Sequence, residues 1–281
     1  MRSILDRIAH YKIKKNGIAV IDHFARRDWN HIRNILDSPR QRIILCRYMN
    51  ECNTLSLAFA MGYLAPLDII QRMYQINPAA AFALDSNGAN ALHIACLNGT
   101  SYDCIDYILS ETEATEVSRP GEHLATKLDL DGRCALHHAV EFACVFQKDD
   151  MNTCSLSYTT DGEEQSYLRV IQRVIRAAPE MLHAQDNCGS NTPMDFVQEL
   201  KAETNIASEE HQRLDEIYKV LHRASIEYYM RRKREWEENG YQKKKNHKKS
   251  KKRGESKKNI KRQGGTYNSS AAELHVYETR R

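Results

Sequence analysis

Residues 89–100 read ANALHIACLNGT and residues 134–144 read CALHHAVEFAC, so the pattern Ala-Leu-His-x-Ala occurs twice. A polar turn with one glycine precedes each copy: DSNG at residues 85–88 and DLDG at residues 129–132. The turn, the start of a helix and an apolar helix face therefore recur together. Such internal self-similarity predicts a repeated structural unit.

Weaker copies of this unit lie on either side. They are AVIDHFARRDWNHIRNILDSP (19–39), NTLSLAFAMG (53–62) and DNCGSNTPMDFV (186–197). A segment with apolar residues at helical spacing follows each of the two strong copies. Its apolar positions are Tyr102, Ile105, Ile108 and Leu109 after the first copy, and Leu168, Ile171, Val174 and Ile175 after the second. Each unit is predicted to be a turn, a short helix, a tight loop and a second helix.

This pattern resembles the ankyrin repeat, in which Asp-x-x-Gly-x-Thr-Pro-Leu-His-x-Ala is followed by a glycine and a second, Leu-rich helix. The matching residues are Asp85, Gly88, Leu92, His93, Ala95 and Gly99, then Gly132, Leu136, His137 and Ala139, and finally Thr192 and Pro193. The resemblance covers about residues 18–205. It implies an all-α fold, an ankyrin-type helical solenoid of about four to five degenerate repeats with long insertions. Residues 1–17 are predicted to be an N-terminal helix or cap.

The resemblance also assigns roles to the histidines of the motif. His93 and His137 are expected to hydrogen-bond the backbone between adjacent units, whereas His138 is expected to be a partly exposed neighbour. Asp195 stands where the last unit would have this histidine. That unit is therefore expected to act as a cap, whose outer face must be polar.

Local chemistry gives other motif residues a physical reason. Gly88 and Gly132 fit turns that need a positive φ or a close approach of two chain segments. Thr192 before Pro193 fits an N-cap followed by the first helical position. Ala95, like its counterpart in the next unit, is small where two helices must approach closely.

The spacing of the units departs from a regular ankyrin array. Equivalent positions 53, 90, 134 and 192 are separated by 37, 44 and 58 residues, whereas the ankyrin period is about 33. Two insertions account for the excess. Residues 110–127 lengthen the connection between the two strong units, and residues 147–166 separate the two helices of one unit.

Residues 206–238 are predicted to form a C-terminal helix. Its apolar stripe consists of Leu214, Ile217, Tyr218, Leu221 and Tyr228. The stripe fits either a helix that packs on the end of the array or a helix that dimerises. The oligomeric state therefore stays open.

The charge of the chain is unevenly distributed. Residues 231–262 contain sixteen Lys or Arg and four Asp or Glu, a net charge of +12, whereas the whole chain is +4 and the remainder is therefore −8. Because residues 239–281 offer no apolar face, they are predicted to be a disordered, Lys/Arg-rich tail. The densest basic positions are Lys243, Lys244, Lys245, Lys248, Lys249, Lys251, Lys252 and Arg253.

Four roles are compatible with this tail. Clustered lysines are typical of a nuclear import signal read by an import receptor, and their charge also fits nucleic acid, with strongly salt-dependent binding. An anionic membrane surface would need a better apolar anchor than Trp236 and Tyr241. The remaining interpretation is a solvated tail without a specific partner. Nuclear import is favoured over the other three.

Several function classes lack their sequence signals. No Gly-x-Gly-x-x-Gly, Walker loop, His-Glu-x-x-His or Gly-x-Ser-x-Gly motif occurs, so no catalytic or cofactor-binding residue is predicted. The eight cysteines include no Cys-x-x-Cys pair, and no fourth ligand completes a zinc site near His93. They are expected to be buried, reduced thiols in an intracellular protein, with the nucleus favoured and the cytoplasm as the alternative. No apolar run of about eighteen residues indicates a membrane span.

The sequence thus predicts a non-enzymatic scaffold or adaptor that binds an unidentified protein partner. Ankyrin arrays present the tips of their turns and their first helices to partners, so the resemblance places candidate contacts at the two strong units. These candidates are Asn87, Ala89, Asn90, Asp131 and Arg133. The alternative is a chromatin- or RNA-associated protein whose basic tail binds nucleic acid.

Overall fold

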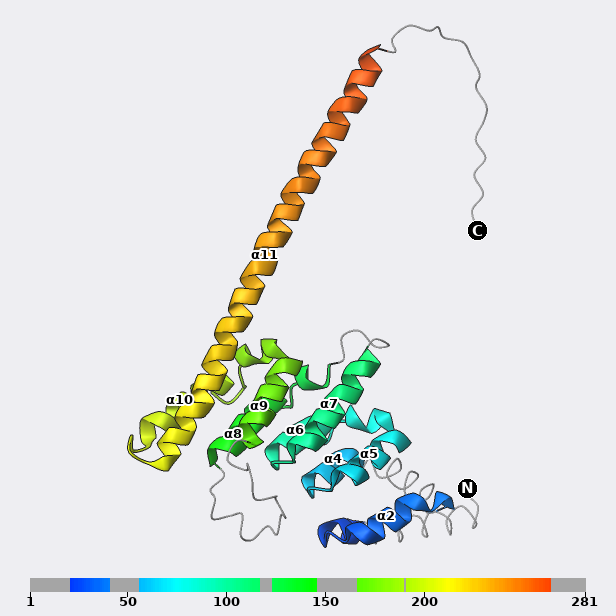
Figure 1. The fold of residues 1–281 in the computed structure, drawn as a ribbon, viewed down its shortest axis with the longest axis vertical. Helices are drawn as coiled ribbons and strands as arrows, with labels where there is room; N and C mark the ends of the chain where they lie inside the picture. The colour runs from blue at the N-terminus through cyan, green and yellow to red at the C-terminus, as the bar shows by residue number, and fades with distance from the viewer. Residues whose placement is uncertain (1–20, 41–55, 117–122, 146–165, 190, 264–281) are drawn as a thin grey trace. The chain divides into compact units, whose positions relative to one another are not determined.

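The computed structural model describes residues 21–40, 56–116, 123–145, 166–189 and 191–263 (Figure 1). The predicted N-terminal cap at residues 1–17 and nearly all of the second insertion lie outside these ranges. The α-helices are α2 (Trp29–Asp37), α4 (Ser56–Gly62), α5 (Leu67–Ile76), α6 (Ala91–Leu97), α7 (Tyr102–Glu116), α8 (Ala135–Val145), α9 (Ser166–Ala177), α10 (Pro193–Glu203) and α11 (Glu209–Gln263). Short 3₁₀ helices are η1 (Pro78–Ala81), η2 (Leu124–Thr126) and η5 (Pro179–His183).

The helices form two layers. In the inner layer α4 packs against α6, α6 against α8, and α8 against α10. In the outer layer α2 packs against α5, α5 against α7, and α7 against α9. Because each inner helix is followed in the chain by an outer helix, the pairs stack side by side, as Figure 1 shows. The predicted all-α solenoid of stacked helix pairs is confirmed.

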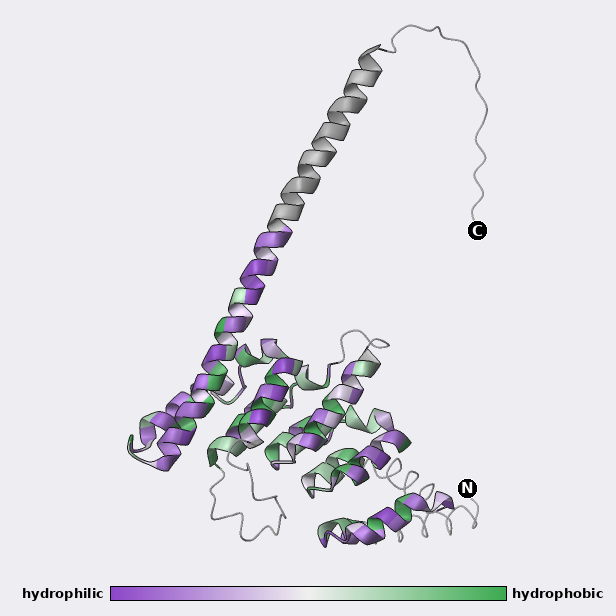
Figure 2. Ribbon diagram, viewed as in Figure 1, coloured by the Kyte–Doolittle hydropathy of each residue, from purple (hydrophilic) through white to green (hydrophobic). Residues whose placement is uncertain are grey.

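Apolar side chains fill the space between the layers. On the inner helices Ala58, Ala95 and Ala139 are buried at equivalent positions, and their small size lets neighbouring helices approach closely. On the outer helices the predicted apolar faces turn inward; Ile105 and Ile171 are fully buried. Figure 2 shows the hydrophobic residues concentrated on the inner helices and the hydrophilic ones on the outer faces of the stack. Since a single helix pair cannot bury such a face alone, the core depends on stacking.

Arginines on the outer helices tie neighbouring units together. Arg33 of α2 donates two hydrogen bonds, of 2.7 and 3.0 Å, to the two carboxylate oxygens of Asp68 on α5. Arg173 of α9 donates to Asp106 and, at 2.9 and 3.2 Å, to both oxygens of Glu113 on α7. Bidentate pairs of this kind fix geometry more firmly than single surface ion pairs do.

The first part of α11 packs as the C-terminal stripe predicts. Leu214, Ile217 and Leu221 are buried, so this segment covers apolar surface of the array. Asp215 accepts hydrogen bonds of 2.6 Å from Lys201 on α10 and from Lys219 one turn further along α11. Lys201, followed by Lys219, lowers the pKa of the Asp215 carboxyl to about 2.

The prediction of disorder from residue 239 is wrong for residues 239–263, because α11 continues to Gln263. The absence of an apolar face argues against packing in a core, but it does not argue against a helix. Lys, Arg, Glu and Gln have high helix propensity, and the sequence has no proline after Pro193. The two glycines inside the helix, Gly240 and Gly254, each cost only about 1 kcal/mol relative to alanine. Residues 264–281 lie outside the described residues.

The chain forms two compact units, residues 1–228 and residues 229–281. The division falls within α11, ten residues before the predicted boundary at 238/239. The first unit contains the helix pairs and the buried stripe of α11. The described part of the second unit is a helix in which Trp236 and Tyr229 are exposed.

Four cysteines of the array are buried free thiols: Cys96, Cys104, Cys134 and Cys144. Burial raises the pKa of Cys144 to about 12 and raises that of Cys96 further, so both remain protonated and unreactive near neutral pH. Their predicted role as small hydrophobic residues is confirmed. Cys188 differs, because it is exposed.

Gly99 offers a direct test of how tightly the inner layer is packed. It has a φ of +65°, and a Cβ there would overlap the ring of Phe142 on α8. Gly99→Ala should therefore lower the free energy of unfolding by more than about 2 kcal/mol. Urea unfolding followed by circular dichroism measures this. The control is Gly62→Ala, whose Cβ would meet Ile94 at an ordinary 3.4 Å; an equal effect of both substitutions would contradict the packing described.

Candidate functional site

An aspartate closes the turn at the tip of each of the two strong repeat units. Asp85 Oδ1 accepts hydrogen bonds of 2.8 Å from the backbone N–H groups of Asn87 and Ala89. Asp129 Oδ1 accepts equivalent bonds of 3.0 and 2.8 Å from Asp131 and Arg133. A side chain that binds two N–H groups of its own turn closes that turn without help from other segments. The glycine of each tip has the positive φ predicted, +75° at residue 88 and +73° at residue 132.

The third tip is built in the same way with one extra residue. Asp186 Oδ1 accepts from the N–H groups of Gly189 and Asn191, at 2.9 and 3.1 Å. These donors lie three and five residues after the aspartate, compared with two and four in the other tips. The third turn thus accommodates one extra residue without losing its aspartate.

Backbone hydrogen bonds join the three tips in a row. Leu130 N–H donates to the Asn87 carbonyl at 2.8 Å, and Asn187 N–H donates to the Asp131 carbonyl at 2.7 Å. The Asn187 side-chain amide adds a bond of 3.2 Å to the Leu130 carbonyl. The tips are therefore held at fixed spacing relative to one another.

Two imidazoles bridge each helix start to the next tip. His93 Nε2 lies 3.2 Å from the Arg133 carbonyl and His137 Nε2 lies 3.2 Å from the Asn191 carbonyl. A carbonyl only accepts, so Nε2 carries the proton, and Nδ1 of His93 accepts the Asn90 N–H at 3.2 Å. Burial lowers the pKa of His93 to about 4 and also lowers that of His137, so both rings are neutral. The inter-unit role predicted for both histidines is confirmed.

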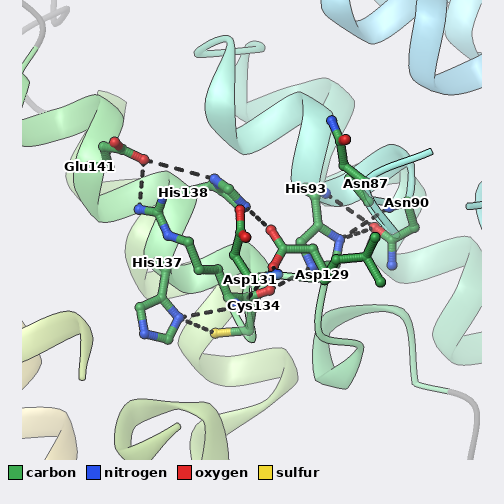
Figure 3. A network of polar contacts seen from close by, with 12 residues as sticks. Asn87, Asn90, His93, Asp129, Asp131, Cys134, His137, His138 and Glu141 are labelled. Atoms are coloured by element: carbon green, nitrogen blue, oxygen red, sulfur yellow. Dashed lines mark hydrogen bonds and ion pairs between the residues drawn. The ribbon is translucent and has the colours of Figure 1, made fainter. Parts of the chain in front are cut away.

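His138 is not the partly exposed neighbour that the sequence predicts: it is 7% exposed. Its Nε2 lies 2.9 Å from Asp129 Oδ2, and its Nδ1 lies 3.9 Å from Glu141 Oε2 (Figure 3). The aspartate that closes the tip thus also holds the histidine of the following helix. Burial raises the pKa of Asp129, but the hydrogen bonds from Arg133 and His138 outweigh it, so the pKa lies below its ordinary value.

Aspartate-closed tips, tip-to-tip hydrogen bonds and imidazole bridges thus recur from one helix pair to the next. A family model of ankyrin repeats, in three copies, matches residues 55–147. Residues 55–147 are ankyrin repeats. The match runs from the start of α4 to the end of α8, and the stacked pairs continue beyond it through α9 and α10. Comparison with curated proteins gives no match.

Ankyrin repeats generally mediate protein–protein interaction, and ankyrin repeat domains are typically non-catalytic. The ankyrin repeats thus indicate a protein partner without identifying it. None of the helices among the described residues combines the length and apolar character needed to cross a bilayer.

The five predicted tip residues of the ankyrin array do not share one environment. Asn87 and Asp131 are exposed at their tips. Asn90 is fully buried: its amide donates to the Leu124 carbonyl at 3.0 Å, and its Oδ1 caps α6. A partner cannot reach it, so its prediction as a contact residue is wrong, and Ala89 is buried as well. Asn90 and Ala89 thus take part in the hydrogen bonds that hold the turn and the start of α6 together.

Arg133 is half-buried and engaged within its own unit. Its guanidinium donates to Glu141 Oε2 on α8 at 2.7 Å, so a partner would meet an ion pair here. The next unit has the same arrangement with different chemistry, because Asn191 donates to Glu199 of α10 at 3.2 Å. In both units the two residues are eight apart. In the preceding unit the equivalent residues are Ala89 and Leu97, and Leu97 is exposed.

Sequence reasoning missed Leu130, which is 72% exposed at the middle tip. An apolar residue between two aspartates of a polar turn is the signal that could have found it. It also missed the series Leu97, Glu141 and Glu199, whose common place in the repeat follows only from aligning the units on their aspartates. We call Asn87, Leu97, Leu130, Asp131, Arg133, Glu141, Asn187 and Glu199 the recognition surface.

The eight basic residues predicted for targeting or nucleic-acid binding, Lys243 to Arg253, all lie within α11. Their backbone is helical, whereas the prediction places them in a disordered tail. They belong to the second compact unit and not to the array.

The buried neutral His93 makes the stability of the array sensitive to acid. A histidine in an unfolded chain titrates near 6.5, and the folded pKa of His93 is about 4. Below pH 6.5 the unfolded state therefore binds the proton first, and stability present at neutral pH is lost as the pH falls from 6.5 toward 4. Between pH 7.5 and 5 this one group should remove about 2 kcal/mol from the free energy of unfolding; His137 acts in the same direction.

Urea unfolding at both pH values tests this. His93→Gln keeps a donor for the Arg133 carbonyl but cannot be protonated, so its loss of stability between the two pH values should be smaller than the parent's. His222→Gln, which changes an exposed histidine of α11, is the control. The same pH dependence in parent and His93→Gln would contradict the assignment.

Proposed function

We propose that the chain is a non-enzymatic scaffold or adaptor that binds another protein through the recognition surface. The observation that carries this proposal is the row of exposed side chains on consecutive tips, Asn87, Leu130 with Asp131, and Asn187, joined by backbone hydrogen bonds of 2.7 and 2.8 Å. A row held rigid before binding loses little conformational entropy when a partner contacts several units at once.

The chemistry of the recognition surface changes along the array. Leu97 is apolar, the Arg133–Glu141 pair is locally neutral, and Glu199 is acidic and bound to a neutral amide. Leu130 is exposed at the tip of the unit that contains Arg133 and Glu141. We therefore expect a partner that places an apolar side chain against Leu130 and a cationic or donor group near Glu199. Covering Leu130 with an apolar group of the partner would remove apolar surface from water, which favours binding.

The basic segment supports a second part of the proposal, that an import receptor directs the chain to the nucleus. Seven lysines and one arginine fall within residues 243–253. The described side chains of the same compact unit do not pack in the core. Such a cluster is the chemistry that import receptors bind.

The alternative is binding to nucleic acid, and the helical course of α11 favours it more than a disordered tail would. A rise of about 1.5 Å per residue spreads the net charge of +12 in residues 231–262 over roughly 48 Å. That length matches several successive phosphates of a nucleic-acid backbone. Retention of nucleic acid on a filter should then fall steeply with salt; affinity that is independent of salt would not come from this helix.

Leu130→Glu tests the recognition surface. Because Leu130 is 72% exposed, its replacement should change the free energy of unfolding by no more than about 0.5 kcal/mol. It should reduce recovery of array-bound proteins in a pull-down with the full chain at least tenfold, because a charge would replace the apolar anchor. Ile206→Glu changes an apolar residue that is 80% exposed but lies outside the tips. Equal recovery by the parent and both variants would show that the tips do not bind.

Replacing the eight basic residues of 243–253 with glutamine tests nuclear entry. Glutamine keeps helix propensity and removes the charge. In a fusion to a fluorescent carrier too large to diffuse through nuclear pores, we expect the parent in the nucleus and the variant in the cytoplasm. The matched control replaces Arg231, Arg232, Lys233 and Arg234, which lie on the same helix, with glutamine. Nuclear accumulation that survives loss of residues 243–253 but not of the control residues would transfer the role to the latter.

A further inference from the structure

A cluster of two histidines and one aspartate lies at the beginning of the described array, far from the recognition surface in sequence. His23 lies in the middle of helical residues 21–25, Asp28 is the N-cap of α2, and His31 lies in the first turn of α2. His23 Nδ1 lies 3.2 Å from Asp28 Oδ2, and the rings of His23 and His31 are stacked with centroids 3.7 Å apart. One nitrogen or oxygen atom from each residue lies within 4.8 Å of the other two.

The turn that carries these residues is fixed by its own hydrogen bonds. Asp28 N–H donates to the His23 carbonyl at 2.9 Å, and Asp28 Oδ1 accepts the His31 N–H at 3.2 Å as the N-cap of α2. Arg27 turns the chain with a φ of +55°, and Phe24 on the opposite side is completely buried. The three side chains therefore stand on a rigid base. The N-cap needs only Asp28, so capping does not explain why two imidazoles converge on the same carboxylate.

We infer that His23, Asp28 and His31 bind one divalent transition-metal ion of the zinc class. In a tetrahedral zinc site, bonds of about 2.0–2.2 Å place two ligand atoms about 3.4 Å apart. The ligand atoms of the cluster lie within 4.8 Å of one another, so binding requires side-chain rotations that tilt the two stacked rings toward the ion. Imidazole nitrogen selects zinc, nickel, cobalt or copper over magnesium and calcium, which prefer oxygen ligands.

The site is open to solvent on one side. The His23 side chain is 26% exposed and that of Asp28 is 47% exposed, so an ion can enter without unfolding the turn. Three protein ligands leave at least one position of a tetrahedral ion for water or for a donor from another molecule. Arg26, three residues after His23, forms an ion pair with Asp22 at 2.8 Å, which partly offsets its positive charge.

Binding at this place would join the end of one helix to the start of the next. α2 is in turn tied to α5 by Arg33 and Asp68. An ion held only by the folded turn stabilises the folded array by mass action. Zinc should therefore raise the unfolding temperature, and a chelator should reverse the rise.

The test titrates Zn²⁺ into the full chain by calorimetry and uses Co²⁺ as a spectroscopic probe. The parent should bind one equivalent of Zn²⁺ through this site. His23→Ala, His31→Ala and Asp28→Asn should each weaken binding at least tenfold. Asp28→Asn is the sharpest variant, because asparagine caps a helix as well as aspartate does but is a poor metal ligand. Circular dichroism of each variant establishes that it folds.

Two controls keep the result specific. His222→Ala removes an exposed histidine elsewhere, and Cys188→Ser removes the exposed thiol; both should bind zinc as the parent does. Co²⁺ bound by nitrogen and oxygen gives visible d–d bands without a thiolate charge-transfer band. The inference is overturned if the parent binds no zinc, if the three cluster variants bind as tightly as the parent, or if the Co²⁺ spectrum shows thiolate ligation that Cys188→Ser abolishes.

Discussion

A neutral imidazole sets the relation between one repeat and the next. His93 accepts the Asn90 N–H at the start of its own helix and donates to the Arg133 carbonyl of the following tip. One ring thus pairs a backbone N–H group at the start of its helix and also a backbone carbonyl 40 residues further along the chain. Because an unpaired buried polar group costs about 1–3 kcal/mol, neither the helix start nor the tip can shift alone without a penalty. His137 repeats the device one unit later. Fixed tips, and with them a rigid surface for a partner, depend on this bridge.

The histidine bridge can form in successive units because the packing of each unit places the histidine and the next tip at the same relative positions. Small residues such as Ala95 and Ala139 let α6 and α8 approach, and the outer arginines hold the second helices. Each unit contacts only its neighbours, so stability is close to a sum of units and interfaces. Variation is then tolerated at positions that no interface uses. The pair Arg133 and Glu141 can become Asn191 and Glu199 without changing the stack, which is why the chemistry of the recognition surface can differ between units on one fold.

The sequence predicts what local pattern determines. The apolar faces, the positive φ of Gly88 and Gly132 and the Thr192 cap follow from residue type and spacing. The bridging role of the two histidines follows from the resemblance to ankyrin repeats, and the structure has each of these features. It fails where a contact comes from far along the chain. Asn90 looks like a tip residue, but its amide bonds to Leu124, 34 residues later, within an insertion that no repeat pattern describes. His138 is buried beside Asp129 of its own unit, and the repeat pattern assigns no partner to this histidine. The basic helix was missed for another reason: an absent apolar face argues against packing and does not argue against a helix.

The irregular spacing of the units is compatible with regular stacking because the extra residues lie outside the atoms that join the tips. Equivalent positions are 44 and 58 residues apart, yet Leu130 still reaches the Asn87 carbonyl and Asn187 still reaches the Asp131 carbonyl. The first insertion begins within α7 and runs to the next tip, and the second lies between α8 and α9, so the turn and inner helix of each unit stay intact. Loop-closure entropy grows only slowly with length, about 0.6 kcal/mol per doubling. An insertion between helices is therefore inexpensive, whereas one inside a tip must be absorbed by its aspartate. The third tip shows such an insertion. The carboxylate of Asp186 accepts from N–H groups one residue further along the chain than those bound by the other two aspartates, and the turn still closes.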